Sequence, residues 1–335
     1  MQTEEICKKK LYTLCKYAKI EKQVFYEGVL KMSHATKEKH YSLGITALLV
    51  CAIIWGTSFV AQSLGGQYAE PFTFNCARNA LATLFLIAIS PLMDKLQGKH
   101  YLFWGTSEPA LKRKLWYGAS CSGTCLALAL YMQQWGLMYT SAGKSGFITA
   151  LYIVLVPILG LFVFHDRVSR NNWLGVFLAI IGMYFICITE SFSVNKGDVL
   201  TLACPILFSI QILIIDFFIS DLDPVRFSTV QFGSCTIISG LMMLLCEQPS
   251  WEQITSSIGP ILYLAIMSSG IAYTLQIVGQ KYVNSVIASM LMSLEAVFAL
   301  LSGWIYLGQT LTLRELSGCL LMFVAIILAQ LPDRK

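Results

Sequence analysis

Apolar runs of about twenty residues follow one another along most of the chain, with short polar breaks between them. A helix of about twenty residues crosses a hydrocarbon core of about 30 Å, and runs that lack a polar face favour lipid over one-sided burial. The pattern predicts ten membrane-spanning helices and therefore an all-α membrane protein. The expected spans cover residues 43–63, 71–92, 115–135, 141–164, 172–189, 198–219, 224–246, 259–280, 284–307 and 313–331.

Composition agrees with this pattern and argues against several classes of protein. Of the 335 residues, 56% are hydrophobic and 13% are charged, against about 25% charged residues in soluble proteins. Several of the cysteines lie within apolar runs, where a thiol packs as a small hydrophobic group. Cys121 and Cys125 have no histidine at zinc-site spacing. We therefore predict no disulfide framework, no metal site and no cofactor.

Lysine and arginine concentrate on one side of the predicted spans. Nine lysines precede the first span and five basic residues lie between the second and third, whereas Lys196 is the clear exception on the opposite side. Because basic residues gather in cytoplasmic segments, we expect a multi-pass protein of a bacterial-type inner cell membrane with both termini in the cytoplasm. The net charge of +5 follows from this topology and implies no nucleic-acid partner.

Residues 1–40 form a basic, cytoplasmic N-terminal segment with scattered apolar positions. Two interpretations stay open. The segment forms an amphipathic helix on the membrane surface, or translation starts at Met32 and residues 1–31 are an artefact of start-site choice.

The chain matches itself in two halves, which predicts one repeat at 41–190 and a second at 191–332. Each repeat holds five spans, an odd number, so the second copy enters the bilayer from the opposite side. Such inverted repeats support alternating access around a central site, although a duplicated channel would share the same symmetry. The matches are Gly136 with Gly279, Tyr139 with Tyr282, Gly160 with Gly303 and Gly175 with Gly318 at an offset of 143, and Pro71 with Pro224 and Phe74 with Phe227 at 153.

Glu295 is the most informative charged residue, because it lies about eleven positions into its span and roughly 16 Å deep. A carboxylate at that depth marks a functional site by default, and the alternative is a buried carboxyl that ties two helices together. Arg78 lies roughly 10 Å from the outer face, where a binding role and snorkelling are both open. Lys144 attracts an anionic group or marks the outer interface.

Amides and aromatic rings with polar tips inside the apolar runs complete the candidate site. They line a polar cavity or form hydrogen bonds between helices, and both interpretations stay open. The candidates for substrate binding or coupling, besides the three charged residues, are Trp55, Gln133, Tyr152, Gln211 and Gln276.

Several sequence stretches resemble the EamA family of the drug/metabolite transporter superfamily, over about residues 42–331. These are WGTSFV in the first span, EPFTFNCARNALA in the second, YTSAGKSGFITALYIVLVPILG in the fourth and SLEAVFALLSGWIYLGQTLTLRELSG in the ninth and tenth. The resemblance touches Trp55, Arg78, Pro157 and Glu295. It implies ten spans in paired five-helix repeats and export of amino acids or other small metabolites by alternating access, commonly driven by ion or solute gradients.

The sequence departs from the family pattern at several positions, which limits the residue roles that the resemblance implies for this chain. Ala296 stands where members often have a proline, and His165-Asp166 and Gly308-Gln309 stand where a glycine-glutamate pair is common. The expected partners are a small-molecule substrate and the lipid bilayer, and a homodimer is left open. The rival functions are a membrane-embedded enzyme or a sensor. The enzyme is disfavoured because the four histidines lie outside the predicted spans and because the sequence has no ATP-binding loop.

Overall fold

The computed structural model describes residues 34–96, 98, 103–140, 142–164, 168–187, 196–307 and 312–331, and all regular secondary structure in these ranges is helical. Residues 1–31, His165-Asp166 and Gly308-Gln309 lie outside the described residues. In chain order the elements are α2 (His34–Gly65), α3 (Pro71–Leu96), α4 (Pro109–Leu137), α5 (Ala142–Ala150), α6 (Tyr152–Phe164), α7 (Arg170–Cys187), α8 (Lys196–Thr201), α9 (Cys204–Phe218), α10 (Pro224–Cys246), α11 (Trp251–Ser256), α12 (Ile258–Tyr263), η1 (Leu264–Ala272), α13 (Tyr273–Tyr282), α14 (Ser285–Met292), α15 (Glu295–Leu307) and α16 (Leu313–Gln330).

Seven helical stretches are long and apolar enough to cross a membrane. They agree with seven of the ten expected spans, and α4, α7 and α16 lie at the other three positions but outside this set. The prediction of an all-helical, multi-pass membrane protein is therefore confirmed. The seven stretches are Glu38–Gly65, Pro71–Leu96, Ser145–Phe162, Lys196–Phe218, Pro224–Cys246, Ile258–Tyr282 and Ser285–Ser302.

Three of these stretches are divided into two helices, and the sixth expected span divides at Leu202 and Ala203 into α8 and α9. The fourth expected span divides at Leu151 into α5 and α6, and Pro157 lies inside α6 beyond the break. The ninth divides at Ser293 and Leu294 into α14 and α15. The hydroxyl of Ser293 donates to the carbonyl of Met290 at 2.7 Å, the type of back-bonding that competes with regular helix.

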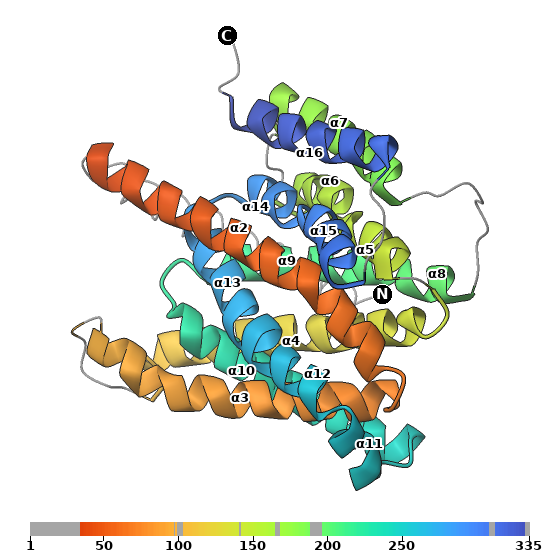
Figure 1. Cartoon of the computed structure of the whole chain (residues 1–335). Coiled ribbons are helices and arrows are strands. Elements are labelled where there is room, and N and C mark those ends of the chain that lie inside the picture. The colour runs from red at the N-terminus through yellow and green to blue at the C-terminus, as the bar shows by residue number, and fades with distance from the viewer. Residues whose placement is uncertain are drawn as a thin grey trace, which may run out of the picture.

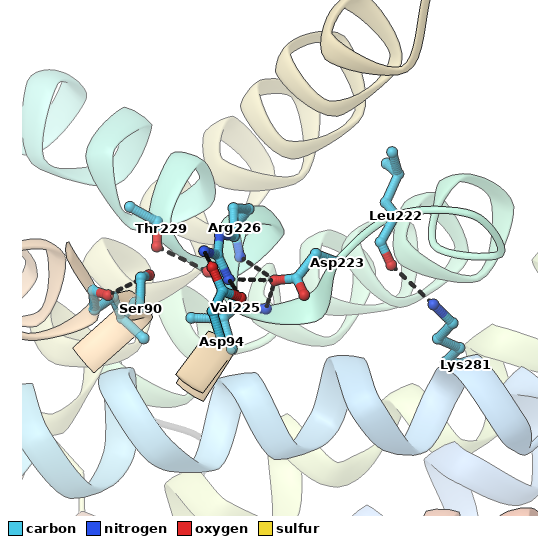
Figure 2. Close-up of polar contacts among 9 residues, drawn as sticks. Ser90, Asp94, Leu222, Asp223, Val225, Arg226, Thr229 and Lys281 are labelled. Carbon is cyan, nitrogen blue, oxygen red and sulfur yellow. Dashed lines mark hydrogen bonds and ion pairs between the residues drawn. The ribbon is translucent and has the colours of Figure 1, made fainter. Parts of the chain in front are cut away.

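Helices α3 and α10 run antiparallel (Figure 1). An acidic residue near the end of each helix is held by the start of the other. Near the end of α3, the carboxylate of Asp94 accepts hydrogen bonds from both terminal nitrogens of Arg226, and both side chains are buried (Figure 2). After the end of α10, the carboxylate of Glu247 accepts from the backbone nitrogens of Phe72 at 2.8 Å and Thr73 at 2.7 Å. The pair is thus joined at both ends.

Helices α7 and α16 pack along each other at one edge of the molecule (Figure 1). Gly182 allows this approach, because a Cβ atom there would lie 2.8 Å from the carbonyl oxygen of Gly318. Close packing through small residues is how helices associate in lipid, where no water drives them together.

Candidate functional site

A cavity lies between the helices and is lined by side chains from both halves of the chain. Its walls come from α2, α3, α4, α5, α6, α9, η1, α13 and α15. The lining combines aromatic rings with a few polar groups, the usual character of a small-molecule site. The lining residues are Trp55, Ser58, Phe59, Gln62, Arg78, Leu130, Gln133, Thr149, Tyr152, Phe208, Ser268, Tyr273 and Glu295.

Glu295 and Tyr152 meet where the fourth and ninth expected spans are divided. Each is the first residue of the helix after a break, α15 for Glu295 and α6 for Tyr152. The hydroxyl of Tyr152 donates a hydrogen bond to Oε1 of Glu295 at 3.1 Å, and both side chains are buried. The start of a helix also favours a nearby negative charge, so this position suits a carboxylate. Of the sequence candidates, the residue expected at the greatest depth therefore lies in the cavity wall with a defined partner.

Arg78 reaches the cavity from α3 and is only 1% exposed. Its Nε and Nη2 atoms donate to the hydroxyl of Ser269 at 3.4 and 3.2 Å, whereas Nη1 is buried without a hydrogen-bond partner among the described residues. Snorkelling was one of the two open interpretations, but a side chain this buried does not reach the surface.

The aromatic part of the lining centres on Tyr273. Its ring lies 4.7 Å from the ring of Trp55 and 5.3 Å from that of Phe232, measured between ring centroids. The indole Nε1 of Trp55 is buried and finds no acceptor in the described part of the chain. Two lining residues, Arg78 and Trp55, thus each have a buried donor without an acceptor in the described part of the chain.

The candidate amides separate into two environments. Gln133 lines the cavity, and its Nε2 donates to the hydroxyl of Thr149 at 3.1 Å. Gln211 and Gln276 are buried outside the lining, where each amide donates to the other at 3.5 and 3.2 Å. For this pair, the structure agrees with the second of the two interpretations, hydrogen bonding between helices.

Lys144 belongs to α5, but its side chain lies outside the described residues. The structure therefore brings five of the eight candidates to one cavity: Trp55, Arg78, Gln133, Tyr152 and Glu295.

Sequence reasoning missed several lining residues, and some of them carried a usable signal. Ser58, Phe59 and Gln62 follow Trp55 by three, four and seven positions, the spacing of one helix face. Ser268 and Phe208 have no such signal, because a single serine or phenylalanine in an apolar run is common packing material. No group of three or more histidine, cysteine or acidic residues suited to a metal ion occurs within the described ranges.

Comparison with known proteins gives a family match over nearly the whole region predicted to span the membrane. The model of the EamA-like transporter family matches residues 42–188 and again residues 195–331. A solved crystal structure of a protein shares the fold with a TM-score of 0.67 at 17% identity, covering 87% of this chain and 97% of that chain.

Similar proteins in other organisms have names that indicate transport. An uncharacterized transporter of Archaeoglobus fulgidus is 30% identical over 284 residues, which is 85% of this chain and 84% of the relative. A probable amino-acid metabolite efflux pump of Salmonella typhimurium is 25% identical, covering 84% of this chain and 93% of the relative.

Proposed function

The chain belongs to the EamA-like transporter family, and from this membership we propose that it is a secondary transporter that exports small metabolites such as amino acids by alternating access. The observation that supports this proposal most directly is a buried carboxylate, Glu295, in the wall of a cavity built from both halves of the chain. An intramembrane carboxylate that faces a cavity is costly and is typical of a substrate or ion pathway. The probable efflux pump of Salmonella typhimurium supports amino acids as the substrate class.

Alternating access is supported by how the lining residues pair across the two sequence matches. At the offset of 143, Tyr152 pairs with Glu295 and Leu130 with Tyr273, and all four line the cavity. At the offset of 153, Trp55 pairs with Phe208, and both line it too. A site whose walls come from matching positions suits a mechanism in which two repeats exchange conformations around it.

Two other matched pairs of residues are asymmetric, because one member of each pair lines the cavity and the other does not. This asymmetry fits one state of an alternating-access cycle. Gln133 and Ser58 line the cavity, whereas their counterparts at the same offsets, Gln276 and Gln211, bond to each other and do not line it. We propose that the cavity extends toward one membrane face here, and that separation of the Gln211–Gln276 pair accompanies access from the other face.

The proposed topology has ten spans in two inverted repeats, at 41–190 and 191–332, in the cell membrane with both termini in the cytoplasm. The two separate family matches support a duplication, and the distribution of lysine and arginine supports the orientation. In this topology Ser58 and Gln133 lie in the outer half of the membrane, so the cavity extends outward in the conformation described.

The test compares internal and external metabolites in cells that overproduce the protein, its Glu295→Ala variant, or neither. Glu252→Ala, a change of an exposed glutamate on α11, is the matched control. We expect a solute that is released by the unmodified protein and the control but not by Glu295→Ala. No difference across a broad metabolite panel would contradict export, and equal release by Glu295→Ala would remove Glu295 from the site.

A further inference from the structure

Arg78 lines the cavity, and its positive charge has no carboxylate partner among the described residues. A guanidinium carries five N–H donors, and two of its nitrogens converge on one acceptor, the hydroxyl of Ser269. A hydroxyl supplies no negative charge, and none of the described carboxylates forms an ion pair with Arg78. An unpaired buried cation is strongly unfavourable, so a missing counter-charge is expected from outside the protein.

The unpartnered donors of the cavity indicate what that counter-charge is. Nη1 of Arg78 and Nε1 of Trp55 both belong to lining residues, both are buried, and neither has an acceptor within the described structure. Both groups are donors only, so they need an acceptor, and the positive charge of Arg78 favours an anionic one. A planar carboxylate accepts two parallel hydrogen bonds from a guanidinium, which adds orientation to charge.

Ser269 owes its position to an irregular helix. It lies in η1, a π-helical stretch from Leu264 to Ala272, between the α-helical segments α12 and α13. A π-helical turn is rare in proteins and is frequently found at functional sites. Its wider turn brings neighbouring residues closer to one face, and here Ser268 lines the cavity while Ser269 holds Arg78.

Gly270 lets this stretch approach α3 closely enough for the contact. A Cβ atom at position 270 would lie 2.6 Å from the Phe85 ring on α3. The next residue along the chain from Ser269 thus packs directly against the helix that carries Arg78, which fixes the distance between the serine hydroxyl and the guanidinium.

We propose that Ser269 is a positioning residue that aims Arg78 at a carboxylate of the transported solute, and that this pair selects carboxylate-bearing solutes over their uncharged analogues. The inference rests on the proposed transport function. It adds a substrate feature and a residue that the sequence did not single out.

The first part of the test identifies the solutes that overproducing cells release. Mass spectrometry of the medium is expected to find solutes that carry a carboxylate. Release of solutes without any anionic group would overturn the inference and leave the transport function intact. No release at all would contradict the transport function itself, so the two failures are distinguishable.

The second part measures charge selectivity in proteoliposomes that contain the purified full chain, with a released acid and its amide as probes. Variants are Ser269→Ala, Ser269→Thr, which keeps a hydroxyl, and Ser234→Ala, which changes a serine of α10 that is not part of the cavity lining and donates to the carbonyl of Val230 in its own helix. We expect Ser269→Ala to lower the acid-to-amide ratio of kcat/KM about tenfold, with the other two close to the unmodified protein.

A purely structural role of Ser269 would lower transport of acid and amide alike, and the ratio would then stay constant. That constant ratio would overturn the inference, as would an equal loss of selectivity in Ser234→Ala. If Ser269→Ala yields too little folded protein, Ser269→Cys replaces it as a similar-sized variant with a weak hydrogen-bonding group, and the same ratio decides.

Discussion

Tyr152 donates a hydrogen bond to Glu295 across 143 positions of sequence, the same offset at which the two halves of the chain match each other. Each is the first residue of a helix that follows a break, and in the proposed duplication the two residues occupy corresponding positions. One position has a carboxyl group and the other a phenol. The proposed repeats would therefore differ in side-chain chemistry at this pair of positions.

If Glu295 carries the coupled proton, Glu295→Gln removes the response of transport to an imposed proton gradient. The amide keeps the size and an acceptor oxygen for the hydroxyl of Tyr152, but it has no titrating group. The measurement is solute flux in proteoliposomes over a series of internal and external pH values.

Tyr152→Phe is the matched variant, because it removes the hydrogen bond and leaves the carboxyl group. It is expected to lower the flux while the flux still responds to the gradient. Unchanged pH dependence in Glu295→Gln would exclude the coupling role.

Loss of one amide from the Gln211–Gln276 pair is expected to destabilise the protein. Gln276→Ala leaves the buried amide of Gln211 without its partner, which costs about 1–3 kcal/mol. The measurement is the Tm of the purified protein in detergent, with Gln248→Ala on the exposed segment after α10 as the control. Equal Tm values for both variants would show that the pair contributes nothing to this state.

Asp94→Asn is expected to be among the most destabilising changes of a single charge. Arg226 would lose the carboxylate that accepts hydrogen bonds from both of its terminal nitrogens, and breaking a buried pair costs about 3 kcal/mol. The control is Asp221→Asn, which breaks a pair with Lys114 in which the aspartate side chain is 49% exposed. Such an exposed pair is worth less than about 1 kcal/mol.

Denaturant or thermal unfolding of the two variants under the same conditions decides this prediction. A loss in Asp94→Asn no larger than that in Asp221→Asn would mean that the joined ends of α3 and α10 do not stabilise the bundle.

The sequence predicted the helical membrane architecture because span length follows directly from the thickness of the hydrocarbon core. The depth of Glu295 could be estimated for the same reason, since each helical residue adds about 1.5 Å. The break between α5 and α6 was harder to locate, because Pro157 lies beyond the break at Leu151. Proline shows that a helix is perturbed, but tertiary packing decides where it divides.

The site could be predicted only in part, because residue type does not reveal which neighbour a side chain meets. Gln133 and Gln276 looked equivalent in sequence, yet one lines the cavity and the other is bonded to Gln211. Ser269 gave no signal at all. Its role depends on the π-helical turn and on the approach of η1 to α3, which are properties of packing.

Gly182→Ala tests whether α7 and α16 depend on close backbone approach. The added Cβ would lie 2.8 Å from the backbone oxygen of Gly318 and 3.1 Å from the backbone nitrogen of Met322, and backbone atoms cannot rotate away. Overpacking of this kind costs about 1–3 kcal/mol, so a lower Tm is expected. Gly259→Ala is the control, because no atom lies within 4 Å of its Cβ position and alanine favours helix over glycine by about 1 kcal/mol. An unchanged Tm in Gly182→Ala would mean that the two helices separate at little cost and that their packing is loose in the membrane.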